Sequence, residues 1–159
     1  MKPNLMPDRV WLATVSATLL AVYMMQSSTA LAQSTRAKDS ESAEIAELVL
    51  AGYEAGGMNE VTRVSQECYE KVASQLFCIK LDLAAQHLDR LAASAGGFPP
   101  NSYFLATAVS ERARPVLAQT GLKREKANTY LDLAARTMAA AVNDQVAASI
   151  RSQSKKPKR

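Results

Sequence analysis

The chain contains two cysteines, Cys68 and Cys78, and the chemistry that such a pair most directly permits is a disulfide bond. They lie ten positions apart in a stretch with helical periodicity, and a straight helix would separate them by about 15 Å along its axis. A disulfide requires Cα atoms within about 7 Å of each other. If the cysteines pair, the helix must break between them, and the apolar stripe changes register at 73–75, where Ser74 can cap a new helix. A bond between two chains, or two buried thiols on a continuous helix, are the alternatives.

The spacing Cys68-x9-Cys78 resembles a helical hairpin at the start of the four-helix bundle in plant inhibitors of invertase and pectin methylesterase. The resemblance covers the two cysteines and the general helical order. Those inhibitors have a second cysteine pair, which this chain lacks. The resemblance implies a bridged hairpin within a small bundle.

His87 is the only histidine. Catalysis would require a nucleophile or a partner carboxylate beside it, and a metal site would require two or three further ligands. The sequence has no HExxH, no CxxC and no glycine-rich phosphate loop. Asp82 and Asp89, seven positions apart on the polar side of the same expected helix, are typical of a solvated face. We therefore expect no enzyme, metal or cofactor, and a hydrolase that uses His87 with Asp82, Asp89 or Glu111 is the less favoured alternative.

The segment "GGFPPNSYF" (96–104) contains three aromatic residues around a stiff loop: Phe98, Tyr103 and Phe104. Exposed aromatic side chains on a loop are typical anchors for a protein partner. If they are buried, they only close the end of a helical bundle. The sequence therefore marks them as candidate partner contacts and leaves both possibilities open.

The last nine residues, "RSQSKKPKR", account for all the net positive charge of residues 33–159. Residues 33–150 carry 12 basic and 14 acidic side chains, whereas 151–159 carry five basic side chains and no acid. The segment is short and has no aromatic residue to stack on bases, so we expect no nucleic acid partner. It is either a disordered solubilising end or a weak contact with an anionic membrane. That contact would use Lys155, Lys156, Lys158 and Arg159.

The first 32 residues have the layout of a secretory signal peptide. A mainly apolar run of 16 residues occupies 10–25, and Ala30-x-Ala32 is a pattern that signal peptidase recognises. We expect cleavage before Gln33, followed by a flexible leader at 33–42 and a periplasmic or secreted location. The Ala-rich sequence of this signal peptide is typical of bacteria. An uncleaved membrane anchor is the alternative.

The remaining chain shows only helical periodicity. Gly56 and Gly57 are expected to end a first helix at 43–55, and "SAGGFPPNS" (94–102) is a second break. Ser102 is expected to cap a third helix that Pro115 kinks and Gly121 ends. The expected helices lie at 43–55, at 59–94 with a break at 73–75, from 102 to 121, and at 123–149, the last with a narrow Ala-rich apolar stripe.

Amphipathic segments of this kind can bury their apolar sides only against one another. The sequence therefore predicts an all-α domain at 43–150, a small bundle of four to five helices, followed by the tail at 151–159. Without a catalytic motif, we expect a non-enzymatic protein that binds another protein. An inhibitor, an effector-immunity protein and a chaperone-like factor all fit. An accessory component of an envelope or secretion apparatus is the alternative. The oligomeric state stays open.

Overall fold

The computed structural model describes residues 9–72 and 74–154, with side chains from residue 40 onward. The chain divides into two units, residues 1–39 and residues 40–159. In the first unit the described backbone is helical from Arg9. The predicted signal at 1–32 and its cleavage stay predictions, whereas 33–42, predicted as a flexible leader, lies within a helix. The predicted basic contact at 155–159 lies outside the described residues.

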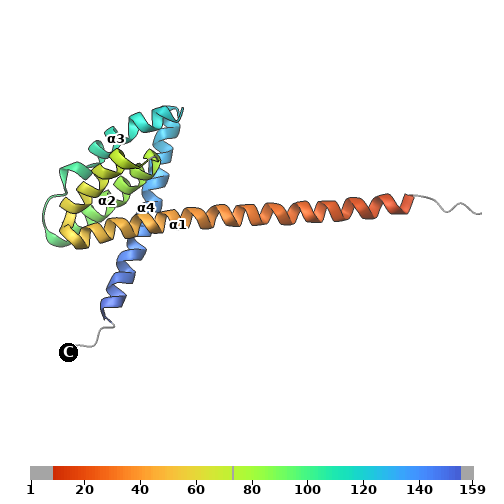
Figure 1. Cartoon of the computed structure of the whole chain (residues 1–159), viewed down its shortest axis with the longest axis horizontal. Helices are drawn as coiled ribbons and strands as arrows, with labels where there is room; N and C mark the ends of the chain where they lie inside the picture. The colour runs from red at the N-terminus through yellow and green to blue at the C-terminus, as the bar shows by residue number, and fades with distance from the viewer. Residues whose placement is uncertain (1–8, 73, 155–159) are drawn as a thin grey trace, which may run out of the picture. The chain divides into compact units, whose positions relative to one another are not determined.

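The protein is all-α, as predicted, and no strand occurs in the described ranges. Among the helices described, none combines the length and the apolar character that a membrane crossing needs. The elements, labelled in Figure 1, are α1 (Arg9–Lys71), α2 (Gln75–Gly96), the short 3₁₀ helix η1 (Ser102–Phe104), α3 (Ala106–Gln119) and α4 (Arg124–Ser154).

Glycine interrupts the helices where the sequence predicted. Within α1 the helical geometry is lost at Gly56 and Gly57, and Gly57 has a φ of 66°, which favours glycine. Gly97 closes α2 at a φ of 67°, and its N–H donates to the carbonyl of Ala93. Because these breaks depend on local backbone freedom, they can be found from sequence alone.

The two cysteines form a disulfide between α1 and α2. Helix α1 ends at Lys71 and α2 begins at Gln75, so the turn falls where the register change predicted it. The two cysteine Cα atoms are 5.6 Å apart. Ser74 holds the N-cap position with extended backbone, but its side chain makes no capping hydrogen bond. The bridged hairpin is thus confirmed.

The start of the third helix differs from the prediction. Ser102 does not cap it; instead Asn101 caps η1 by accepting a hydrogen bond from the backbone N–H of Tyr103 at 2.9 Å. Helix α3 begins only at Ala106, and Leu105 is exposed at its N-cap. An Asn side chain competes well for such backbone donors, so the chain forms an extra 3₁₀ turn before α3.

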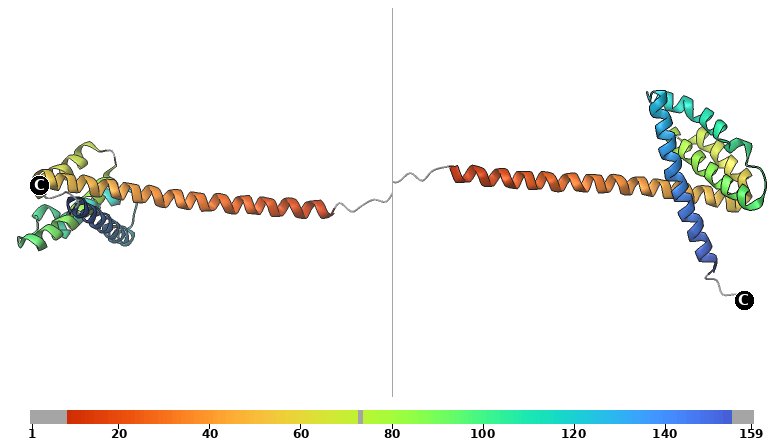
Figure 2. Two further views of the ribbon diagram at one scale, coloured as in Figure 1. Left: turned by 90° about the horizontal axis from the view of Figure 1, so that it is seen from below. Right: turned by 180° about the vertical axis from the view of Figure 1, so that it is seen from behind.

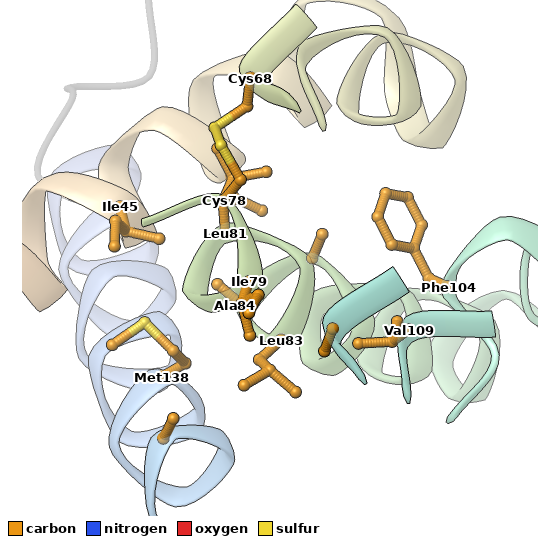
Figure 3. Packing of buried hydrophobic residues seen from close by; sticks show 14 of the residues in the cluster. Ile45, Cys68, Cys78, Ile79, Leu81, Leu83, Ala84, Phe104, Val109 and Met138 are labelled. Atoms are coloured by element: carbon orange, nitrogen blue, oxygen red, sulfur yellow. A yellow bond between two sulfur atoms is a disulfide. The ribbon is translucent and has the colours of Figure 1, made fainter. Parts of the chain in front are cut away.

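Helix α2 is the centre of the second unit, with α3, α4 and η1 all in contact with it. Figure 3 shows Ile45 of α1 and Met138 of α4 on one side of α2, and Phe104 and Val109 on another. The predicted stripe of α4 faces this core with Ala134, Met138 and Val142 buried. Figure 2 shows that the last turns of α4 continue past the other helices of this unit.

Candidate functional site

A row of three polar residues runs along α2 at Asp82, Gln86 and Asp89, and all three are buried. The exposed fraction is 0% for Asp82 and 2% for Asp89. The prediction that these two aspartates belong to a solvated face is therefore wrong. Because α2 is enclosed by its neighbours, its polar side is covered as well as its apolar side, and the buried groups must find partners within the protein.

Asp82 receives hydrogen bonds from two helices. The hydroxyl of Ser65 and the phenol of Tyr69, both on α1, donate to its carboxylate, Tyr69 at 3.2 Å. From α3, the Arg112 Nε donates to Asp82 Oδ2 at 2.9 Å and forms an ion pair with it. A buried carboxylate with a cationic partner and two hydroxyl donors is well compensated.

The 3₁₀ turn is held by the other two members of the row. Gln86 Nε2 donates to the carbonyl of Phe104 at 2.9 Å. Asp89 Oδ2 accepts from the backbone N–H of Asn101 at 2.8 Å. Burial raises the pKa of Asp89, and the N–H of Asn101 and the charge of Arg90 offset part of that rise. The polar row of α2 thus fixes the segment that carries Tyr103.

Tyr103 and Arg112 form one rigid unit at the surface. The Arg112 guanidinium lies over the Tyr103 ring, 3.8 Å from its centroid, and Arg112 Nη2 donates to the Tyr103 carbonyl at 2.9 Å. The Tyr103 hydroxyl lies 3.2 Å from the Ser65 hydroxyl. Since the single Ser65 proton goes to Asp82, the Tyr103 hydroxyl is the donor in that contact.

These side chains form one wall of a groove of about 510 Å³ between α1 and α3, which we call the α1–α3 groove. A second hollow of about 440 Å³ shares Gln75, Val116 and Gln119 with it. The groove thus continues past the turn that the disulfide closes. Its lining residues are Gln66, Tyr69 and Glu70 of α1, Gln75 of α2, Tyr103 of η1, and Arg112, Pro115, Val116 and Gln119 of α3.

The hydroxyl groups beside Asp82 suit positioning rather than reaction. Ser65 is fully buried, so no substrate reaches its oxygen. The pKa of Tyr69 is raised above its ordinary value, first by burial and then by the negative charge of Asp82. Tyr69 therefore stays a neutral phenol and a hydrogen-bond donor at neutral pH. The arrangement holds Arg112 and Tyr103 in fixed positions beside the groove.

His87 lies on another side of α2. Its Nε2 is 2.9 Å from the side-chain oxygen of Asn143 on α4. The polar row follows the spacing i, i+4, i+7 from Asp82, and His87 falls off that face of the helix. The structure does not bring His87 together with Asp82 or Asp89, because His87 lies on another face of α2 and contacts Asn143 instead. Within the described residues, no cluster of three or more His, Cys, Asp or Glu side chains is placed to hold a metal ion.

The three aromatic candidates have different positions. Phe98 is 48% exposed, and its ring lies over Gly96, where an added Cβ would come within 2.0 Å of the ring. Tyr103 is half-buried and lines the α1–α3 groove. Phe104 is 1% exposed and packs in the core (Figure 3). For this residue the buried alternative therefore holds, rather than an exposed contact with a partner.

Sequence reasoning missed Ser65, Tyr69 and Arg112. One signal was present: Ser65 lies four residues after Val61 and three before Cys68, within the apolar stripe of that helix. A polar residue in an apolar stripe requires a buried partner. Nothing local identified that partner as Asp82 or added Arg112 to it.

No family model, no curated protein and no solved structure matches the chain. The geometry of the site is therefore the basis for a functional assignment. The disulfide adds one constraint on location, because such bonds are typical of proteins outside the cytosol.

Proposed function

We propose that this chain is an exported binding protein whose α1–α3 groove holds an extended segment of another protein. The observation that carries the proposal is the fixed pair formed by Tyr103 and Arg112 in the wall of an elongated groove. Tyrosine and arginine are among the residues most enriched at the energetic centres of protein interfaces. The predicted contact role of Tyr103 is kept, and Arg112 is added to it.

The lining chemistry matches a polypeptide backbone. Three glutamines, Gln66, Gln75 and Gln119, are exposed at the groove, and each carboxamide both donates and accepts hydrogen bonds. Pro115 and Val116 supply apolar wall between them. An extended segment presents N–H and C=O groups with side chains on alternate sides, so it can use both kinds of surface.

The groove is also preorganised. The disulfide ties α1 to α2 at one end, and the Asp82–Arg112 ion pair ties α2 to α3 beneath it. A binding surface that is already ordered loses less conformational entropy when it binds. Export, through the predicted signal at 1–32, would place this surface in the periplasm or outside the cell, where the bridge forms.

Site-specific photo-crosslinking tests the proposal. A photoreactive phenylalanine analogue replaces Gln119 in the groove or, as a control, Gln153, which is exposed near the end of α4. The protein is expressed with its own leader and irradiated in the cells that export it. We expect one discrete adduct from position 119 and none from 153. The adduct should be lost when Gln66→Trp fills the opposite side of the groove.

The proposal fails if both positions give the same adducts, or if Gln66→Trp leaves the adduct at position 119 unchanged. Circular dichroism of the Gln66→Trp variant verifies that the helices are intact. Gln66 is exposed, so the substitution is not expected to disturb the core.

A further inference from the structure

A separate cavity, of about 410 Å³, lies between α3 and α4 next to the turn that joins them. It shares no lining residue with the α1–α3 groove. On α3 its wall includes Ser110, Arg114 and Leu117, and on α4 it includes Arg124, Asn128 and Leu131. The spacings i, i+4, i+7 on each helix show that one face of α3 lies opposite one face of α4. The volume is within the range of about 300–1,000 Å³ that small-molecule sites occupy.

The cavity combines an apolar floor with a cationic rim. Leu117, Leu122 and Leu131 contribute the apolar surface. Arg114 and Arg124 bring one guanidinium from each helix, and no acidic residue lines the cavity. Two positive charges therefore border an apolar space without a carboxylate among the lining residues.

Neither arginine is neutralised within the described part of the chain. The ion pairs there involve other cations, including Arg63 and Arg112, while Arg114 and Arg124 make none. Glu111 and Glu125 are close to them in sequence, but both are exposed and neither lines the cavity. An anion that entered the cavity would meet the two guanidinium groups without displacing a protein carboxylate.

We propose that this cavity binds a small amphipathic organic anion. Its carboxylate would lie between Arg114 and Arg124, since a planar guanidinium forms paired hydrogen bonds with a carboxylate. Its apolar body would lie against Leu117, Leu122 and Leu131. The neutral side chains of Ser110 and Asn128 add hydrogen-bonding groups at the edge. This site is independent of the α1–α3 groove and of the proposed protein partner.

Fluorescence titration with anilinonaphthalene sulfonate, itself an apolar body with an anionic head, tests the site. The protein is purified in its disulfide-bonded form after expression with its own leader. We expect saturable binding of one probe per chain. Arg114→Gln and Arg124→Gln should each weaken it about tenfold, the effect of losing one charge-assisted contact. Arg136→Gln on the exposed side of α4 is the matched control and should leave the affinity unchanged.

Competition then identifies the ligand chemistry. Decanoate, which has both head and tail, should displace the probe, whereas decanol without the charge and acetate without the tail should not. Ala118→Phe adds a ring to the cavity wall and should also reduce binding. Unchanged affinity in both arginine variants, equal displacement by decanol and decanoate, or absence of saturable binding would each overturn the proposal. Near-ultraviolet circular dichroism verifies that every variant keeps the native fold.

Discussion

Asp82 of α2 and Arg112 of α3 form an ion pair, with 2.9 Å between Oδ2 and Nε, in which the aspartate is completely buried and the arginine is 24% exposed. The pair joins the centre of the bundle to the wall of the α1–α3 groove. Arg112 reaches inward to the carboxylate and, through its stacking on Tyr103, shapes the surface above it. The same contact thus serves both stability and the proposed binding site.

Removal of Arg112 is expected to cost more stability than removal of a nearby arginine on the same helix. Arg112→Leu leaves the Asp82 carboxylate buried without its cation, and the free energy of unfolding should fall by about 3 kcal/mol. Arg114→Leu removes an exposed charge and should change it by less than about 0.5 kcal/mol. Urea unfolding followed by circular dichroism measures both. Equal effects would show that the pair does not stabilise the fold.

Removal of two different tyrosine hydroxyls is expected to change the stability of the protein in opposite directions. The Tyr69 hydroxyl donates to Asp82, so Tyr69→Phe should destabilise the protein by about 1–2 kcal/mol. The Tyr130 hydroxyl is buried and has no hydrogen-bond partner within the described residues. Tyr130→Phe removes this unsatisfied group and should be neutral or stabilising by up to about 1 kcal/mol. Thermal unfolding of the two variants, each changed by one oxygen atom, compares them directly.

Stability should fall at alkaline pH because the phenols of the same two tyrosines lose their protons more readily in the unfolded chain. Burial is the main cause that raises the pKa of Tyr69 and of Tyr130 in the folded protein. The unfolded chain therefore loses these protons first. The stabilising effect is complete below the ordinary tyrosine pKa of about 10 and is lost as the pH rises above it. The double variant Tyr69→Phe/Tyr130→Phe should show a shallower decline of unfolding free energy above pH 10, and an identical slope would contradict this assignment.

The disulfide closes a short loop, and its removal is expected to destabilise the hairpin. Cys68→Ala/Cys78→Ala should lower the free energy of unfolding by about 2–3 kcal/mol, because the unfolded chain gains freedom. Mass spectrometry with and without reductant verifies that the wild-type bond lies within one chain. The oxidised wild type and the double variant are then compared in urea. No difference in midpoint would exclude a stabilising role for the bridge.

Alanine substitutions at two glycines of α1 should change the stability of the protein in opposite directions. Gly57 has a φ of 66°, and nothing lies within 4 Å of an added Cβ, so the cost is conformational alone. Gly57→Ala should destabilise by about 1–2 kcal/mol. Gly52 is helical, and its added Cβ would make an ordinary contact with Val61 Cγ2 at 3.6 Å. Gly52→Ala should stabilise by about 0.5–1 kcal/mol, and urea midpoints of both variants provide the comparison.

Much of the architecture could be predicted because it depends on neighbours in sequence. Gly57 interrupts a helix because of its own backbone freedom, and the apolar spacing around Met138 determines which face of α4 turns inward. The turn between Cys68 and Cys78 is marked in the sequence by a change in the register of the apolar stripe, and the disulfide joins its two sides. These features need no information about which elements meet in space.

The candidate site required the tertiary structure. The exposed glutamines and the half-buried Tyr103 line one groove only because α1, η1 and α3 converge there. Phe98, Tyr103 and Phe104 are near neighbours in sequence, yet one is exposed, one half-buried and one in the core. Local sequence showed three equivalent aromatic residues, and only the docking of the loop distinguished them.

The amino-acid sequence by itself determined that the chain is helical, where its helices break and that two cysteines can meet. Only the tertiary structure decided that Asp82 is a buried anchor rather than a solvated charge, and that Ser65, Tyr69 and Arg112 converge on it. Periodicity records which side of a helix is apolar, whereas burial depends on how many neighbours surround it. Helix α2 is enclosed on its polar side too, and no local pattern encodes that.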